Sequence, residues 1–154
     1  SVAANKGRPY GLKFAVPKKK NDRLYSAVAE LGLGLEDKMD IPVGLLSGGQ
    51  RQAIALLMAT MTPISFLILD EHTAALDPKT AEIIMKLTDR IVREKSLTAI
   101  MVTHNLRYAV EYGNRMLMLH HGDIVLERKA AAKTETTVDD ILSVFNEISI
   151  ECGN

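Results

Sequence analysis

The sequence predicts an α/β domain built on a mainly parallel sheet, with a helical subdomain before it. Two short apolar runs, Ser65–Leu69 and Leu97–Val102, are rich in strand-forming residues and carry no charge. The segment between them has the length and the apolar stripe of a helix, as in a right-handed strand-helix-strand crossover. Uninterrupted apolar strands are typical of parallel sheets covered on both faces. We therefore expect both runs to be buried strands.

Composition sets broad limits on the function. The chain has 154 residues, enough for one domain with a core, and its formal net charge of zero gives no global attraction to nucleic acid or to a membrane surface. No apolar run approaches the roughly 20 residues that span a bilayer, and the N-terminal residues lack a secretory signal pattern. A single cysteine, Cys152, leaves no internal disulfide and fits a reducing cytosol.

The first part of the chain reads as a basic lead-in followed by a helix. Residues 1–23 are rich in Lys and Arg, and their glycines and prolines break any long helix. A solvated surface is the simpler interpretation of this charge, and contact with acidic loops or anionic headgroups is the alternative. A helix is predicted from about Asp22 to Leu31, stopped by Gly32 and Gly34, before a helical turn near residues 36–40 and a loop at residues 41–44.

The next segment, LSGGQ at residues 46–50, opens a helix in a way that favours an anion. The Ser47 hydroxyl can accept a backbone N–H as N-cap, and Gly48 and Gly49 let another group approach the backbone closely. A helix N-terminus of this kind is a ready phosphate site, and a plain Ser-capped helix is the alternative. The helix is predicted over Gln50–Met61, with the inward side chains Ala53, Ile54, Leu57, Met58 and Met61.

Two carboxylates, Asp70 and Glu71, follow the first predicted strand. Ligands of open α/β sheets bind beyond the carboxyl ends of the strands, so these side chains are candidates for cation binding and for proton transfer. A surface acidic pair is the alternative interpretation. His104 follows the second predicted strand at the same kind of position, where a neutral imidazole can hydrogen-bond a phosphate.

Asp77 and Pro78 predict a sharp helix start, with Asp as N-cap and Pro at the first helical position. The helix they open carries a core stripe of Ala81, Ile84, Leu87, Ile91 and Val92.

The C-terminal part is predicted to contain a helix at 105–112, a hairpin of strands at 115–120 and 123–127, a loop at 130–136 and a final helix. Thr137 and Asp140 form a capping-box-like start to that helix, whose predicted inward side chains are Val138, Ile141, Leu142 and Phe145. His120 and His121 lack further ligands at metal-binding spacing, so we reject a metal site there.

These motifs in this order resemble the ABC (ATP-binding cassette) transporter ATPases. LSGGQ, FLILDE (residues 66–71), TAALD (residues 73–77) and His104 resemble the signature motif, Walker B strand, D-loop and switch histidine. The resemblance implies a P-loop NTPase (RecA-like) fold, with residues 1–62 in the helical subdomain and 63–154 in the C-terminal half of the ATPase core. His72 departs from the family, most of which has Pro after the Walker B glutamate.

The same resemblance implies roles for individual residues. Asp70 would hold Mg²⁺, usually through water, and Glu71 would act as general base, with His104 at the γ-phosphate as a second catalytic residue. The residues implied at the ATP of an opposing subunit are Ser47, Gly48, Gly49, Gln50 and, from the loop along which subunits communicate, Asp77.

One half of an ABC ATPase is not found. A Walker A loop requires Gly-x-x-x-x-Gly-Lys-Ser/Thr, and the chain contains no Gly-Lys pair. A glutamine loop and the aromatic residue that stacks on adenine are not found either. The sequence therefore resembles the second half of the ATPase, and the 154-residue chain by itself is expected to be inactive.

Three functions follow as hypotheses. The first is the ATP-hydrolysing subunit of an importer-type ABC transporter. It would use ATP and Mg²⁺ at the inner face of the cell membrane, with a second ATPase subunit, permease subunits and a substrate-binding protein. The sequence around the motifs looks most like that of bacterial ATP-binding proteins for amino-acid-like solutes. It does not identify the solute. The alternatives are an ABC-family ATPase of DNA repair or translation, and a non-catalytic module that offers LSGGQ to an intact partner.

Overall fold

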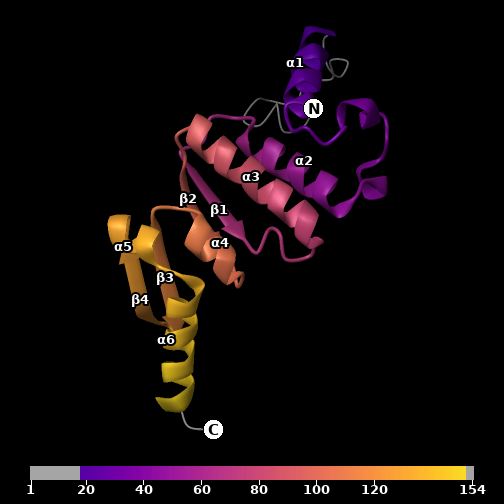
Figure 1. Ribbon diagram of the computed structural model, residues 1–154. Helices are drawn as coiled ribbons and strands as arrows, with labels where there is room; N and C mark the ends of the chain where they lie inside the picture. Colours follow the sequence, from indigo (N-terminus) through magenta and orange to yellow (C-terminus); the bar gives the residue numbers. More distant parts are fainter. Residues whose placement is uncertain (1–17, 152–154) are drawn as a thin grey trace. The chain divides into compact units, whose positions relative to one another are not determined.

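A computed structural model of the protein describes residues 18–151, with side chains for residue 22 and residues 24–148 (Figure 1). Most of the basic lead-in, residues 1–17, and Cys152 lie outside the described residues. The chain divides into two compact units, residues 1–101 and 102–154, and each unit has its own apolar core.

The first unit is helical at its start and then alternates strands with helices. Its helical part comprises α1 (Lys18–Ala29), the 3₁₀ turns η2 (Glu36–Lys38) and η3 (Val43–Leu45), and α2 (Gly48–Thr60). It continues with β1 (Phe66–Asp70), α3 (Pro78–Glu94) and β2 (Thr98–Val102), which ends at the boundary between the units. The strands β1 and β2 pair in a small parallel sheet. Figure 1 shows α2 and α3 packed side by side.

The N-terminal helix differs slightly from its prediction. It begins at Lys18 instead of Asp22 and ends at Ala29, two residues before the predicted end. Gly32 and Gly34 then adopt φ values of +68° and +61°, which glycine reaches without steric cost, so they stop the helix as predicted.

The inward face of α2 was predicted only in part. Ala53 is fully buried, but Met58 is 45% exposed, and Ile54, Leu57 and Met61 are partly buried. The residues that are buried lie on a neighbouring stripe, namely Gly49, Ala53, Leu56 and Thr60. The helix carries apolar side chains around most of its circumference, so its sequence does not select one face. Contacts with α1 and α3 make that selection.

The prediction that both strands are buried on both faces was wrong. In β1, Leu67 and Leu69 are buried in the core with residues of α2 and α3, whereas Phe66 is 47% and Ile68 65% exposed. In β2, most side chains are exposed. Within the described part of the first unit, helices cover one face of this sheet, and the other face presents what we call the uncovered sheet face: Phe66, Ile68 and Ile100.

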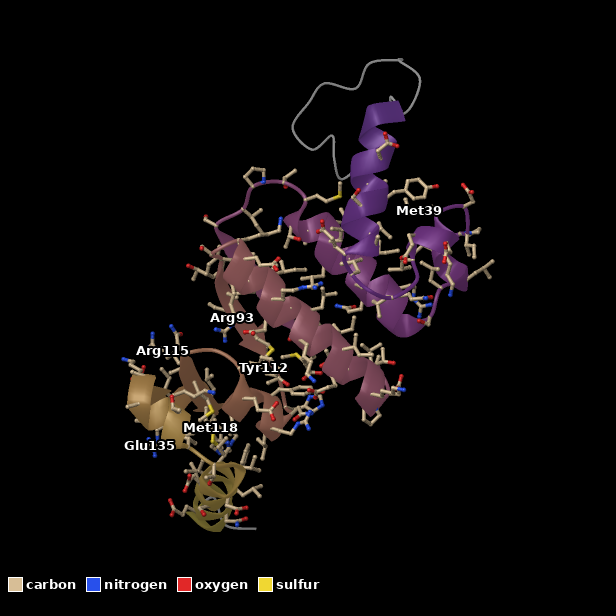
Figure 2. The ribbon with its side chains drawn as sticks, turned by 45° about the horizontal axis from the view of Figure 1, so that its top comes forward. Met39, Arg93, Tyr112, Arg115, Met118 and Glu135 are labelled. Carbon is tan, nitrogen blue, oxygen red and sulfur yellow. The ribbon has the colours of Figure 1, made fainter. Side chains whose placement is uncertain are left out.

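The second unit contains α4 (Leu106–Glu111), the hairpin of β3 (Arg115–His120) and β4 (Asp123–Lys129), α5 (Ala130–Glu135) and α6 (Val138–Glu151). The hairpin was predicted correctly, including its turn, where His121 and Gly122 have φ values of +49° and +92°. The core of the second unit consists of Met116, Met118 (labelled in Figure 2), Leu126 and Ile141. Within the described residues, β3 pairs with β4 alone and β1 with β2 alone.

One prediction for this unit was wrong, and another was right only for Ile141 and the partly buried Val138. The segment predicted as a loop forms the helix α5, in which the buried Lys133 donates a hydrogen bond to the Val110 carbonyl. In α6 the inward face is formed by Ile141 with Val144 and Ile148, while Leu142 and Phe145 are 43% and 44% exposed. Both outcomes depend on contacts with α4 and the hairpin, which the local pattern does not contain.

Candidate functional site

The signature segment begins α2 with a complete capping box. The Gln50 N–H donates to Ser47 Oγ at 3.3 Å, and the Ser47 N–H donates to Gln50 Oε1 at 3.2 Å. Ser47 is exposed and takes extended backbone angles, as an N-cap residue does. The predicted cap is thus confirmed.

The two glycines of the signature segment lie against the start of α3. A methyl group on Gly48 would come within 3.0 Å of the Leu76 side chain, and one on Gly49 would overlap the methyl group of Thr80. Packing inside the chain therefore favours glycine at position 49, and less strongly at position 48, where the end of the Leu76 side chain would have to shift slightly. The signature segment and the segment at residues 73–77 are consequently in direct contact.

Both the oxygen and the nitrogen of the Gln50 side-chain amide form hydrogen bonds within the chain. Its Oε1 also accepts from Lys38 Nζ at 3.3 Å, and its Nε2 donates to the Leu33 carbonyl at 3.2 Å. On the other side of the segment, the Arg51 guanidinium donates to the Leu46 carbonyl. Lys38 and Arg51 thus brace the signature segment and were missed by the sequence analysis. Their spacing of 12 and 5 residues from their partners gives no local signal.

Asp70 and Glu71 lie at the carboxyl end of β1, as predicted, and both are exposed. A groove of about 520 Å³ runs between α2, β1 and the loop after β1. Its lining includes Gly48 from the signature segment together with Asp70, Glu71 and His72. The structure therefore brings the start of α2 and the acidic strand end together on one groove.

The backbone turns sharply at Glu71, which has a φ of +42°. A residue other than glycine adopts this left-handed backbone conformation only where the surrounding structure holds it. The next residue, His72, is hydrogen-bonded from its Nε2 to Thr88 Oγ1 of α3 at 3.2 Å. Burial lowers the pKa of His72 below its ordinary value.

Asp77 caps α3 as predicted. Its Oδ1 accepts from the Thr80 N–H at 3.0 Å, and Pro78 occupies the first helical position. Hydrogen bonds from Thr80 hold the pKa of the Asp77 carboxyl below its ordinary value. The carboxylate is exposed and ionised at neutral pH, and one of its oxygens is engaged by the helix that it caps.

His104 belongs to the second unit. It follows β2 by two residues and is exposed, and the next residue, Asn105, caps α4 by accepting from the Tyr108 N–H at 3.3 Å. His104 thus follows the strand end as predicted, and the structure places it in a short bend before a helix capped by Asn105.

The carboxylates after β1 suit one kind of metal ion. Within residues 18–151, no group of three or more His, Cys, Asp and Glu side chains could form a metal cage. Mg²⁺ does not need such a cage, because it is held by one or two carboxylates with waters and substrate phosphates. Asp70 and Glu71 on an open groove fit that pattern.

Comparison with known proteins agrees with these features. The family model described as "ABC transporter" matches residues 1–74. A tyrosine transport ATP-binding protein of Clostridioides difficile is 48% identical over 94% of this chain and 57% of its own length. A methionine import ATP-binding protein of Bacillus cereus is 35% identical over 90% of this chain and 42% of its own length.

Solved structures give the same result for the fold. A dimeric ATP-binding cassette in a post-hydrolysis state with ADP and Pi matches 77% of this chain and half of its own, with a TM-score of 0.61 and 28% identity. A nucleotide-free cassette of an ABC transporter matches 99% of this chain with a TM-score of 0.70 and 19% identity. The chain spans about half the length of the curated relatives it matches. The sequence motifs, the P-loop NTPase fold and these matches all show the same likeness, to the ATP-binding proteins of ABC transporters.

Proposed function

We propose that the chain is the C-terminal portion of an ATP-binding and ATP-hydrolysing subunit of an importer-type ABC transporter. One observation carries the proposal: the chain presents both a capped start of α2 at the exposed Ser47 and two exposed carboxylates at the end of β1. An exposed helix N-terminus suits phosphate, and paired carboxylates suit a hard cation and proton transfer. The chain would therefore supply groups that phosphoryl transfer requires at two places, the carboxylates at its own nucleotide and the start of α2 at the nucleotide of another subunit.

Each residue of the site would have a distinct role. Asp70 would hold Mg²⁺, an ion that neutralises charge on phosphate oxygens when it is bound. Glu71, as general base, would accept a proton from the attacking water, and His104 would donate a hydrogen bond to the γ-phosphate.

The signature segment would act on ATP bound by another subunit. Ser47, Gly48 and Gly49 would face that nucleotide, while Gln50 and Asp77 would hold the two helix starts that form this surface. The remaining part of the site, including the Walker A loop, would come from a sequence that this chain does not contain.

The relatives suggest partners and a solute class. The matched relatives include proteins named for tyrosine transport and methionine import, and one solved cassette is described as dimeric. We propose a dimer of ATPase subunits at the inner face of the cell membrane, together with permease subunits and a substrate-binding protein. Among residues 18–151, no helix is long and apolar enough to cross a bilayer. Solutes of amino-acid type fit the relatives best.

Substitution of the proposed base tests the function. The assay would use a completed subunit, in which the chain is joined to the part of the Clostridioides difficile relative that it does not cover. Glu71→Gln keeps the size of the side chain and removes the base. Turnover should fall by a factor of roughly 10² or more, with ATP binding retained and an ATP-bound dimer accumulating in gel filtration. Turnover within about threefold of the unsubstituted subunit, well short of the loss of a general base, would refute the assignment.

Ser47→Arg tests the shared site in the same completed subunit. The bulky cation should block ATP-driven dimerisation while the affinity of the monomer for ATP, measured by calorimetry, stays unchanged. An equal loss of monomer affinity would show that the signature segment binds its own nucleotide.

A further inference from the structure

The turn that carries Glu71 is linked to the middle of α3 by a side-chain hydrogen bond from His72. Backbone hydrogen bonds within the turn run from the Ala74 N–H to the Glu71 carbonyl at 2.9 Å and from the Leu76 N–H to the Thr73 carbonyl at 3.1 Å. These bonds shape the turn but do not connect it to a helix. His72 makes such a connection, because its ring reaches Thr88, 16 residues later, in the middle of α3.

The hydrogen-bond pattern defines the form of the imidazole ring. The Thr88 hydroxyl donates its single hydrogen to the Ile84 carbonyl at 2.8 Å, so Thr88 Oγ1 can only accept from His72. His72 Nε2 must therefore carry a proton. Thr88 is 4% exposed and lies on the buried face of α3, a helix of 17 residues, so the acceptor is fixed in the core.

We propose that His72 is a positioning residue for Glu71. The bond from its ring to Thr88 holds the turn so that Glu71 keeps its left-handed backbone and presents its carboxylate to the groove. The inference rests on the proposed function, in which Glu71 is the base. Because His72 and Glu71 are adjacent, a shift of the ring moves the backbone that orients the carboxylate, and small displacements of a catalytic group reduce turnover strongly.

Three substitutions in the completed subunit test this proposal. His72→Leu keeps a side chain of similar bulk without a donor, and Thr88→Val removes the acceptor with almost no change in shape. His72→Gln offers an amide N–H at about the reach of Nε2. We expect the first two to lower kcat roughly tenfold, within the 10²-fold that a misplaced catalytic group can cost, and to leave KM for ATP and ATP-driven dimerisation unchanged. His72→Gln should restore kcat to within about twofold of the original.

If the substitutions lowered kcat only by disturbing the packing of the core, the three variants would give a different pattern of kcat values. If His72→Leu retained full kcat, or if His72→Gln lost as much as His72→Leu, the positioning role would be overturned. Thermal unfolding of each variant identifies those that fail to fold. If a variant fails to fold, the ¹⁵N chemical shifts of the His72 ring in the unsubstituted protein still test the proposal. A ring protonated at Nδ1 alone would also overturn it. If Glu71→Gln had no effect on turnover while the Nε2–H form was observed, the proposed function would fail and the contact would stand.

Discussion

Two regions of the first unit differ sharply in how completely their side chains find partners within the chain. At the starts of α2 and α3, Ser47, Gln50 and Asp77 all form hydrogen bonds with the chain, and the glycines fit against neighbouring side chains. On the uncovered sheet face, by contrast, Ile68 is 65% and Ile100 51% exposed. Helix starts can be completed by residues nearby in sequence, whereas a sheet face needs a second layer to cover it.

The largest expected effect is at the tightest contact of the helix starts. Gly49→Ala places a methyl group on the Thr80 side chain, so either this side chain or the two helices must shift. We expect the free energy of unfolding to fall by roughly 1–3 kcal/mol, as for other overpacked cores, measured by urea denaturation. Gly44→Ala, with open space around it, is the control and should change little. Thr80→Ser removes the overlapping methyl and should recover part of the loss in the double variant. Without such recovery, the overlap with Thr80 would not be the cause.

A smaller effect is expected at Gln50. Gln50→Ala removes the bonds to the Ser47 N–H, Lys38 and the Leu33 carbonyl, and should lower the free energy of unfolding by about 1 kcal/mol. Lys38→Met removes one of these contacts and should cost less. Hydrogen exchange at the Ser47 amide gives the local measurement, and equal exchange rates in Gln50→Ala and the original would contradict the capping box.

Acid should loosen the start of α3. The folded-state pKa of Asp77 is lowered, so its contribution is present above the unfolded-state pKa of about 3.9 and is lost as pH falls through the lower folded value. Hydrogen exchange at the Thr80 amide should therefore speed up, relative to its intrinsic rate, below about pH 4. Asp77→Asn, which caps without a charge, should show no such change. The same acid response in Asp77→Asn would assign it to another group.

The smallest effect on stability is expected on the uncovered sheet face. Ile68→Thr and Ile100→Thr change exposed side chains and keep strand propensity, so the free energy of unfolding should change by about 0.5 kcal/mol or less. Their effect on association should be large, because an exposed apolar face with open strand edges recruits other chains. Light scattering should show self-association of the 154-residue chain that these variants reduce. A monodisperse chain that binds MgATP at micromolar concentration would contradict both this account and the expected inactivity of the chain alone.

The sequence by itself determined the features that depend on neighbouring residues. Caps at Ser47, Asp77 and Thr137 and the turn at His121 and Gly122 were all predicted correctly, because each needs only a few adjacent residues in a defined conformation. The positions of Asp70 and Glu71 at a strand end followed from the same local information.

Only the tertiary structure decided the rest. The buried face of α2, the exposure of Ile68, the helix at Ala130–Glu135 and the bond from His72 to Thr88 all depend on elements distant in sequence. An apolar side chain is buried only where another layer covers it, and a polar side chain finds a distant partner only after the helices have packed. Periodicity and spacing in the sequence indicate which local structures and faces a segment can adopt. The packing of the helices and strands then selects one of them.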